Sequence, residues 1–183
     1  MSDLSKVKKI NSLCSETVRF YIIFVFCLLA FGITYILIRT SPLLDPFLEF
    51  NALISSLALN LLGANTSILG TDVSSSTFSF RVIAECTSLL FTGIFASAVM
   101  AWPSTARQKM AGIGIAALGL FLFNLVRIVS LFYIGTYTPT TLDFSHFFVW
   151  PIVMILLTVG LWLLWTEGIT ETSQIQKASH REA

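Results

Sequence analysis

The chain contains 183 residues, of which 55% are hydrophobic and only 11% are charged. Soluble domains carry roughly 25% charged residues, so this composition is typical of a membrane protein. The net charge of +1 and the absence of a long basic run argue against nucleic acid as a partner. Membrane lipids are therefore the expected surroundings of most side chains.

Four apolar stretches could cross a bilayer: residues 20–38, 87–102, 110–134 and 147–165. A helix needs about 20 residues to cross a hydrocarbon core of about 30 Å, so the second stretch is short. The first stretch follows a polar N-terminus, and its end, YILIRTSPLLDP, offers no convincing cleavage site. This predicts a retained helix rather than a signal peptide. The expected fold is one all-α membrane domain, residues 1–183, with four spans.

The segment of residues 39–86 joins the first two spans and is expected outside the membrane. In its first half, DPFLEFNALISSLALNLLG, five apolar residues recur at helical spacing: Phe50, Leu53, Ile54, Leu57 and Leu61. Polar residues fall opposite them: Glu49, Ser56 and Asn60. This pattern predicts an amphipathic helix that lies in the membrane interface or packs across the ends of the spanning helices. The alternation in TFSFRVI predicts a strand of a small β-hairpin outside the bilayer.

The distribution of basic residues predicts the orientation of the spans. With four spans and both termini in the cytoplasm, eight Lys and Arg residues lie inside and two, Arg39 and Arg81, lie outside. With the amphipathic stretch as a fifth span, the same residues would divide five against five. Basic residues favour the cytoplasmic side, so four spans are expected, with cytoplasmic tails at residues 1–19 and 166–183.

This topology brings three chemically unusual residues to the outer side of the membrane. Cys86 precedes the second span, His146 begins the fourth, and Arg127 lies seven residues below the outer end of the third. A guanidinium within a span costs at least ~2.5–3.5 kcal/mol and rarely faces lipid. Arg127 therefore indicates either a functional site or a charge that binds backbone carbonyls. Asn124 and Ser130 extend it into a polar stripe on one helical face.

Cys86 and His146 each have a structural alternative, because cysteine often acts as a small buried hydrophobe and interfacial histidine as a hydrogen-bonding residue. At the start of a helix, however, the dipole favours a thiolate and a neutral imidazole. Glu85 would raise the pKa of the thiol if it pointed inward, so it is expected to point away. Asp143 is expected either to orient the His146 ring or to remain a solvated loop carboxylate.

A thiol, an imidazole and a guanidinium together fit acyl transfer. The thiolate attacks a carbonyl, the imidazole moves protons, and the fixed cation stabilises the oxyanion. The Cys and His spacing favours no metal site, and no cofactor is expected. Cys14 and Cys27 are placed in the cytoplasm and in the first span, so no disulfide with Cys86 is expected. The alternatives are a small transporter that uses Arg127 as an anion site and a scaffold subunit that binds a partner.

Three short motifs, in this order, resemble the exosortase/archaeosortase family: ECTSL from Glu85, NLVR ending at Arg127, and SHF around His146. The segment LLGANTSILGTDVSSSTFSFRVIAE before the cysteine is also similar to the family, so the likeness covers roughly residues 51–165. Many members have more spans, and this chain resembles compact forms such as exosortase H. Thr87 and Ser88 stand where the family often has Ser and Gly.

The resemblance implies a membrane cysteine protease/transpeptidase in the cytoplasmic membrane of a prokaryote. It implies Cys86 as the nucleophile, Arg127 as the stabiliser of the oxyanion and of the substrate, and His146 as the acid/base. Asn124 would support the Arg127 face, and Ser88 would keep small side chains near the thiol.

The implied substrates are exported proteins with a C-terminal recognition motif, one transmembrane helix and a basic cluster. The implied acceptor is a surface glycan or glycolipid, with water as the alternative. Gly112, Ala116 and Gly119 form a row of small residues that predicts either a docking face for the substrate helix or internal helix packing.

Overall fold

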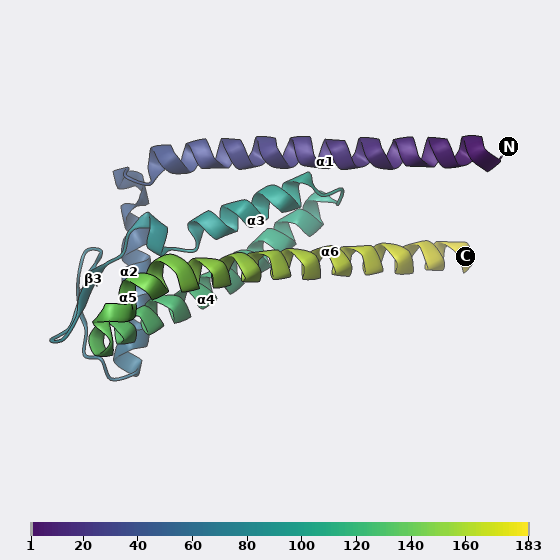
Figure 1. Ribbon diagram of the computed structural model, residues 1–183. Coiled ribbons are helices and arrows are strands. Elements are labelled where there is room, and N and C mark those ends of the chain that lie inside the picture. The colour runs from purple at the N-terminus through teal and green to yellow at the C-terminus, as the bar shows by residue number, and fades with distance from the viewer. Residues whose placement is uncertain (1, 183) are drawn as a thin grey trace.

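The computed structural model describes the backbone of residues 2–182 and the side chains of residues 15–169. Four helices run along one another: α1 (Ser2–Ile38), α3 (Leu89–Ala101), α4 (Ala106–Tyr137) and α6 (Trp150–Glu182). Successive helices run in opposite directions, so both termini lie at one end of the molecule (Figure 1). We call this the terminal end, and we call the opposite end, which carries the β-sheet, the sheet end.

Three segments are long and apolar enough to cross a membrane: Ser15–Ile38, Ala106–Tyr137 and Pro139–Ile169. The fourth expected span corresponds to α3, which has only 13 residues and covers about 20 Å. Pro103 follows α3 closely, and the next helix starts with a capping box of Thr105 and Gln108. These residues stop α3 early, so length and composition support three spanning helices.

The expected tails are continuous with the helices at both ends. Helix α1 begins at Ser2 and α6 continues to Glu182, although solvated tails were expected at residues 1–19 and 166–183. Most polar residues in these stretches are compatible with a helix, so the helix propagates beyond its apolar part. The cytoplasmic placement of these ends stays a prediction.

The segment between α1 and α3 folds into a crossing helix and a sheet at the sheet end. Helix α2 (Asp45–Leu61) follows a short 3₁₀ turn, Pro42–Leu44, and lies across the end of α1 rather than along it (Figure 1). The strands β1 (Ser67–Leu69), β2 (Asp72–Ser74) and β3 (Ser79–Arg81) pair antiparallel in that order. The predicted hairpin is therefore a three-stranded meander.

Helix α2 confirms the predicted amphipathic helix, but its apolar row faces outward. The buried residues of α2 are Leu48, Asn51, Ala52, Ser55, Ser56 and Leu59. Most of the predicted apolar row is exposed: Phe50, Leu53, Leu57 and Leu61. Small and polar side chains let α2 approach the sheet and α4 closely. The exposed row is left for lipid, which agrees with the expected interfacial position.

Two groups of buried side chains hold the fold together. The sheet cluster joins α2, the sheet and α4 through Leu48, Ala52, Leu59, Val73, Val82 and Phe132. The helix cluster joins α3, α4 and α6 through Phe91, Phe95, Val99, Ala116, Leu120 and Met154. Gly112 lies against Trp165, whereas the space beside Gly119 is open. The predicted row of small residues is therefore divided, with Gly112 and Ala116 used for internal packing.

Candidate functional site

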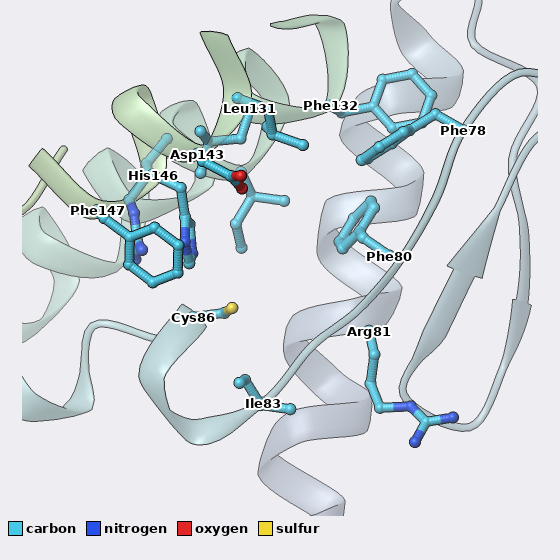
Figure 2. Close-up of a pocket in the computed structure, with 13 residues that line it drawn as sticks. Phe78, Phe80, Arg81, Ile83, Cys86, Leu131, Phe132, Asp143, His146 and Phe147 are labelled. Carbon is cyan, nitrogen blue, oxygen red and sulfur yellow. The ribbon is translucent and has the colours of Figure 1, made fainter. Parts of the chain in front are cut away.

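A cavity of about 300 Å³ lies at the sheet end, and Cys86, Arg127 and His146 all line it. The remaining lining residues are mostly apolar: Phe78, Phe80, Arg81, Ile83, Ile128, Leu131, Phe132, Leu142, Asp143 and Phe147. Figure 2 shows the His146 ring directed toward the sulfur of Cys86. Three residues from separate segments thus meet at one cavity, as the topology predicted.

Cys86 lies on a tight turn and not in the first turn of a spanning helix. It ends the 3₁₀ turn Ala84–Cys86, in which the Thr87 N–H and hydroxyl both donate to the Ala84 carbonyl, at 3.1 and 2.7 Å. Helix α3 begins only at Leu89, with Ser88 as its N-cap residue. The expected position of the thiol at the start of this helix is therefore wrong. The reason is that Thr87 closes the preceding turn.

Arg127 is a buried cation whose hydrogen-bond acceptors are neutral. Its side chain is only 5% exposed. One terminal nitrogen donates to the Glu85 carbonyl at 3.5 Å and to the Asn124 side-chain oxygen at 3.3 Å. The Nε atom is buried and has no hydrogen-bond partner within the part of the chain that the structure describes. Among side chains 15–169, no carboxylate lies within ion-pair distance of it.

Asn124 joins the arginine to the turn that carries the thiol. It is 1% exposed, and its amide nitrogen donates to the Cys86 carbonyl at 2.8 Å. Because its side-chain oxygen accepts from Arg127, one amide holds both groups in position. The predicted supporting role of Asn124 thus has a defined contact in the structure.

Ser130 and Ser88, the other predicted supporting residues, do not line the cavity. The Ser130 hydroxyl donates to the Arg127 carbonyl at 2.8 Å, within its own helix. Ser88 is buried at the start of α3, where its carbonyl accepts the first helical N–H, from Thr92. Both residues serve local helix structure, so the polar stripe on α4 reaches the cavity only through Arg127.

Glu85 turns its side chain away from the thiol, as expected. Its carboxylate pairs with Arg39 at 2.9 Å, and both side chains are about half exposed. The backbone carbonyl of Glu85, by contrast, faces Arg127. The negative charge next to Cys86 in the sequence is therefore neutralised outside the cavity.

His146 lies in a π-helical segment, Ser145–Val149, between α5 (Leu142–Phe144) and α6. The helix begins at Leu142, so the expected position of His146 at a helix start is wrong. A π-helical turn is rare and often occurs at functional sites. Asp143 lines the same cavity but is exposed, and no hydrogen bond joins it to His146 within the described residues. The structure thus gives Asp143 no orienting contact.

The aromatic wall of the cavity was not recognised from the sequence. Phe78 and Phe80 form part of it, and both rings lie within 6.5 Å of the Phe132 ring by their centroids. The alternation in TFSFRVI contained this information, because residues two apart in a strand share a face. An apolar wall around a thiol favours a substrate with apolar side chains.

The described residues offer no place for a metal ion or a disulfide at this site. Within residues 15–169, no group of three His, Cys, Asp or Glu side chains could hold a metal. Cys27 and Cys86 are free thiols, and the side chain of Cys14 lies outside the described residues.

Comparisons with protein-family models, curated proteins and solved structures find no match to this chain. The resemblance to the exosortase/archaeosortase family accordingly stays a prediction that depends on three short motifs.

Proposed function

We propose that this protein is a membrane cysteine protease or transpeptidase of the exosortase type. One observation carries the proposal: Cys86, Arg127 and His146, from three separate segments, line a single cavity. The buried guanidinium of Arg127, which has no carboxylate partner among side chains 15–169, supports it further, because such a cation suits a negative charge that develops only during a reaction. Arg127 and His146, which share this cavity with Cys86, belong to the NLVR and SHF motifs on which the family resemblance also depends.

The proposed reaction has two steps. The Cys86 sulfur bonds to the carbonyl carbon of the scissile peptide while His146 accepts the thiol proton. Arg127 stabilises the oxyanion, and the C–N bond then breaks as His146 returns the proton to the leaving amine. The product is a thioester on Cys86. An amine or hydroxyl of a glycan or glycolipid, or water, attacks this thioester and releases the thiol.

The proposed substrates are exported proteins with a C-terminal motif, one transmembrane helix and a basic cluster. In this arrangement α3 forms the fourth, short membrane helix, and the sheet end faces outward from the cytoplasmic membrane of a prokaryote. The basic cluster would stay in the cytoplasm beside the terminal end. The motif would then leave the membrane at the level of Cys86.

Co-expression with a tail-bearing protein from the same host tests the proposal. Processing should occur with the native protein and stop completely in Cys86→Ala, as read by the mass of the substrate. Cys27→Ala is the matched control, because Cys27 is also a free thiol but lies in α1. Equal processing by native protein and Cys86→Ala would contradict the proposal.

A further inference from the structure

Strand β3 is an edge strand beside the cavity. It pairs with β2 on one side only, as the strand order β1-β2-β3 shows. Phe80, Arg81 and Ile83 follow one another along the wall of the cavity toward Cys86 (Figure 2). The other strands lie on the side of this segment away from Cys86. The unpaired edge of β3 therefore borders the candidate site.

The hydrogen bonds to β2 identify the backbone groups on the unpaired edge. The Val82 N–H donates to Thr71 at 2.9 Å, and the Phe78 carbonyl accepts from Ser75 at 3.0 Å. In an antiparallel pair, successive residues direct their N–H and C=O groups to opposite sides. Ser79 and Arg81 therefore direct theirs away from β2. Among residues 15–169, no hydrogen bond to these outward backbone groups is present.

We propose that the substrate residues just before the scissile bond pair with this edge as an additional strand. The inference rests on the proposed function and names how that function would hold its substrate. Strand β3 runs toward Cys86, and a substrate that passes from outside into the membrane runs the same way, so the pairing is parallel. Two strand residues cover about 6.6 Å. The substrate then continues past Ile83, where the carbonyl of its scissile bond meets the thiol of Cys86.

The residues that line the cavity favour an extended peptide over a second copy of the protein as the partner of the unpaired β3 edge. An added strand gains affinity from main-chain hydrogen bonds and selectivity from pockets for alternate side chains. The rings of Phe78 and Phe80 line such a pocket. The Nε–H of Arg127, which has no partner within residues 15–169, can donate to a carbonyl oxygen of the peptide. A second copy of β3 fits poorly, because the exposed Arg81 on this short strand opposes edge-to-edge pairing.

A proline substitution tests the edge without disturbing the ladder to β2. Ser79→Pro removes an outward N–H, whereas Ser79→Ala keeps that N–H and removes only the hydroxyl. Two reagents alkylate Cys86, each with loss of halide: acetyl-Ala-Ala-Val-Ala chloromethyl ketone, which can pair with β3, and iodoacetamide, which cannot. The measured quantity is the ratio of their second-order rate constants, read by mass spectrometry of the Cys86 peptide.

The ratio should fall about tenfold in Ser79→Pro, the effect of one lost hydrogen bond, and remain unchanged in Ser79→Ala. N-methylation of the peptide reagent gives an independent measurement on the native protein. Methyl groups should slow labelling at every second amide only, because alternate amides face the edge. This measurement still decides the matter where Ser79→Pro does not fold.

The possible results distinguish a failure of the edge pairing from a failure of the proposed function. An unchanged ratio in Ser79→Pro, or equal effects of N-methylation at all amides, overturns the edge pairing and leaves Cys86 as the nucleophile. A change of oligomer size in Ser79→Pro with an unchanged ratio overturns it in favour of a contact between copies. If neither reagent labels Cys86 in the folded native protein, both the edge pairing and the proposed function fail.

Discussion

The buried side chains of the helix bundle differ between the helix cluster and the candidate site. Toward the terminal end, the helix cluster fills the space between helices with side chains such as Phe95, Leu120 and Met154, each at most 1% exposed. Toward the sheet end, α4 buries Asn124 and Arg127 between this helix cluster and the sheet cluster, to which α4 contributes Phe132. The change occurs within one turn of α4, between residues 120 and 124. Helix α4 thus contributes both to the apolar helix cluster and to the polar site.

This difference explains how a buried charge can be held in place. The helix cluster fixes the relative positions of α3, α4 and α6, so that Asn124 meets the turn at Cys86. We therefore expect substitutions of the polar residues at the site to reduce activity, and substitutions of buried residues in the helix cluster to reduce stability.

The largest expected effect is on activity, at Arg127. Arg127→Lys keeps the charge but loses the planar guanidinium and its Nε donor, so under the proposed function the oxyanion would lose its stabilising contact. We expect kcat/KM for substrate processing to fall roughly 10²–10³-fold, as for loss of one oxyanion donor. The measurement is processing of a tail-bearing substrate by purified protein in detergent. Arg39→Lys, at the exposed ion pair with Glu85, should retain native activity.

The next effect is on stability, at Leu120, one turn before the polar site. Leu120 is fully buried in the helix cluster, so Leu120→Ala leaves a cavity. We expect a loss of about 2–5 kcal/mol in the free energy of unfolding in detergent. The rate of Cys86 alkylation per folded molecule should stay native. Leu122→Ala removes an exposed leucine from the same helix and should have little effect on stability. Equal losses in the two variants would contradict the role of the helix cluster in stability.

Much of the sheet end could be predicted from the sequence. Hydropathy located the long helices, and charge counting placed Cys86, Arg127 and His146 at one end, because antiparallel helices bring such positions together. The alternation in TFSFRVI located β3, and helical spacing located α2. Each of these patterns extends over many residues, so a single unusual residue does not hide it.

Local geometry at the site could not be predicted in the same way. The 3₁₀ turn at Cys86 depends on the hydroxyl of Thr87, and the π-helical turn at His146 leaves no periodic trace. Which face of α2 packs against the protein was also left open by the sequence pattern. In a membrane protein, lipid can cover an apolar face, so amphipathicity does not tell which face is inside. Individual hydrogen bonds determine the turn at Cys86, and the surrounding lipid determines which face of α2 is exposed.

A smaller effect on stability is expected at the glycines of α4. A Cβ atom at Gly112 would overlap the ring of Trp165, whereas Gly119 has open space around it. Gly112→Ala should therefore cost about 1–3 kcal/mol, typical of overpacking, as measured by thermal unfolding in detergent. Gly119→Ala should be neutral or slightly stabilising, because alanine favours the helix. If Gly119→Ala were the variant that lost substrate processing, Gly119 would instead belong to a docking face for the substrate helix.

The smallest expected effect separates the two arginines that line the cavity. Unlike Arg127, Arg81 has a carboxylate partner: it donates two hydrogen bonds to Asp72, at 2.6 and 2.9 Å, on the exposed surface of the sheet. These bonds, followed by the nearby charge, lower the pKa of Asp72 below its ordinary value. A lowered pKa means that the ion pair stabilises the fold above the ordinary pKa of aspartate. That contribution disappears as the pH falls through the lowered pKa.

The Tm of the native protein should therefore slightly exceed that of Asp72→Asn at pH 7, and the two should converge in acid. High salt at pH 7 should also reduce the difference, because the pair is exposed. Activity should be unaffected, since the Arg81 side chain points away from Cys86 (Figure 2). A Tm difference independent of both pH and salt would show that Asp72 stabilises the sheet by some other means than its charge. A loss of activity in Asp72→Asn would make Arg81, like Arg127, part of the polar site.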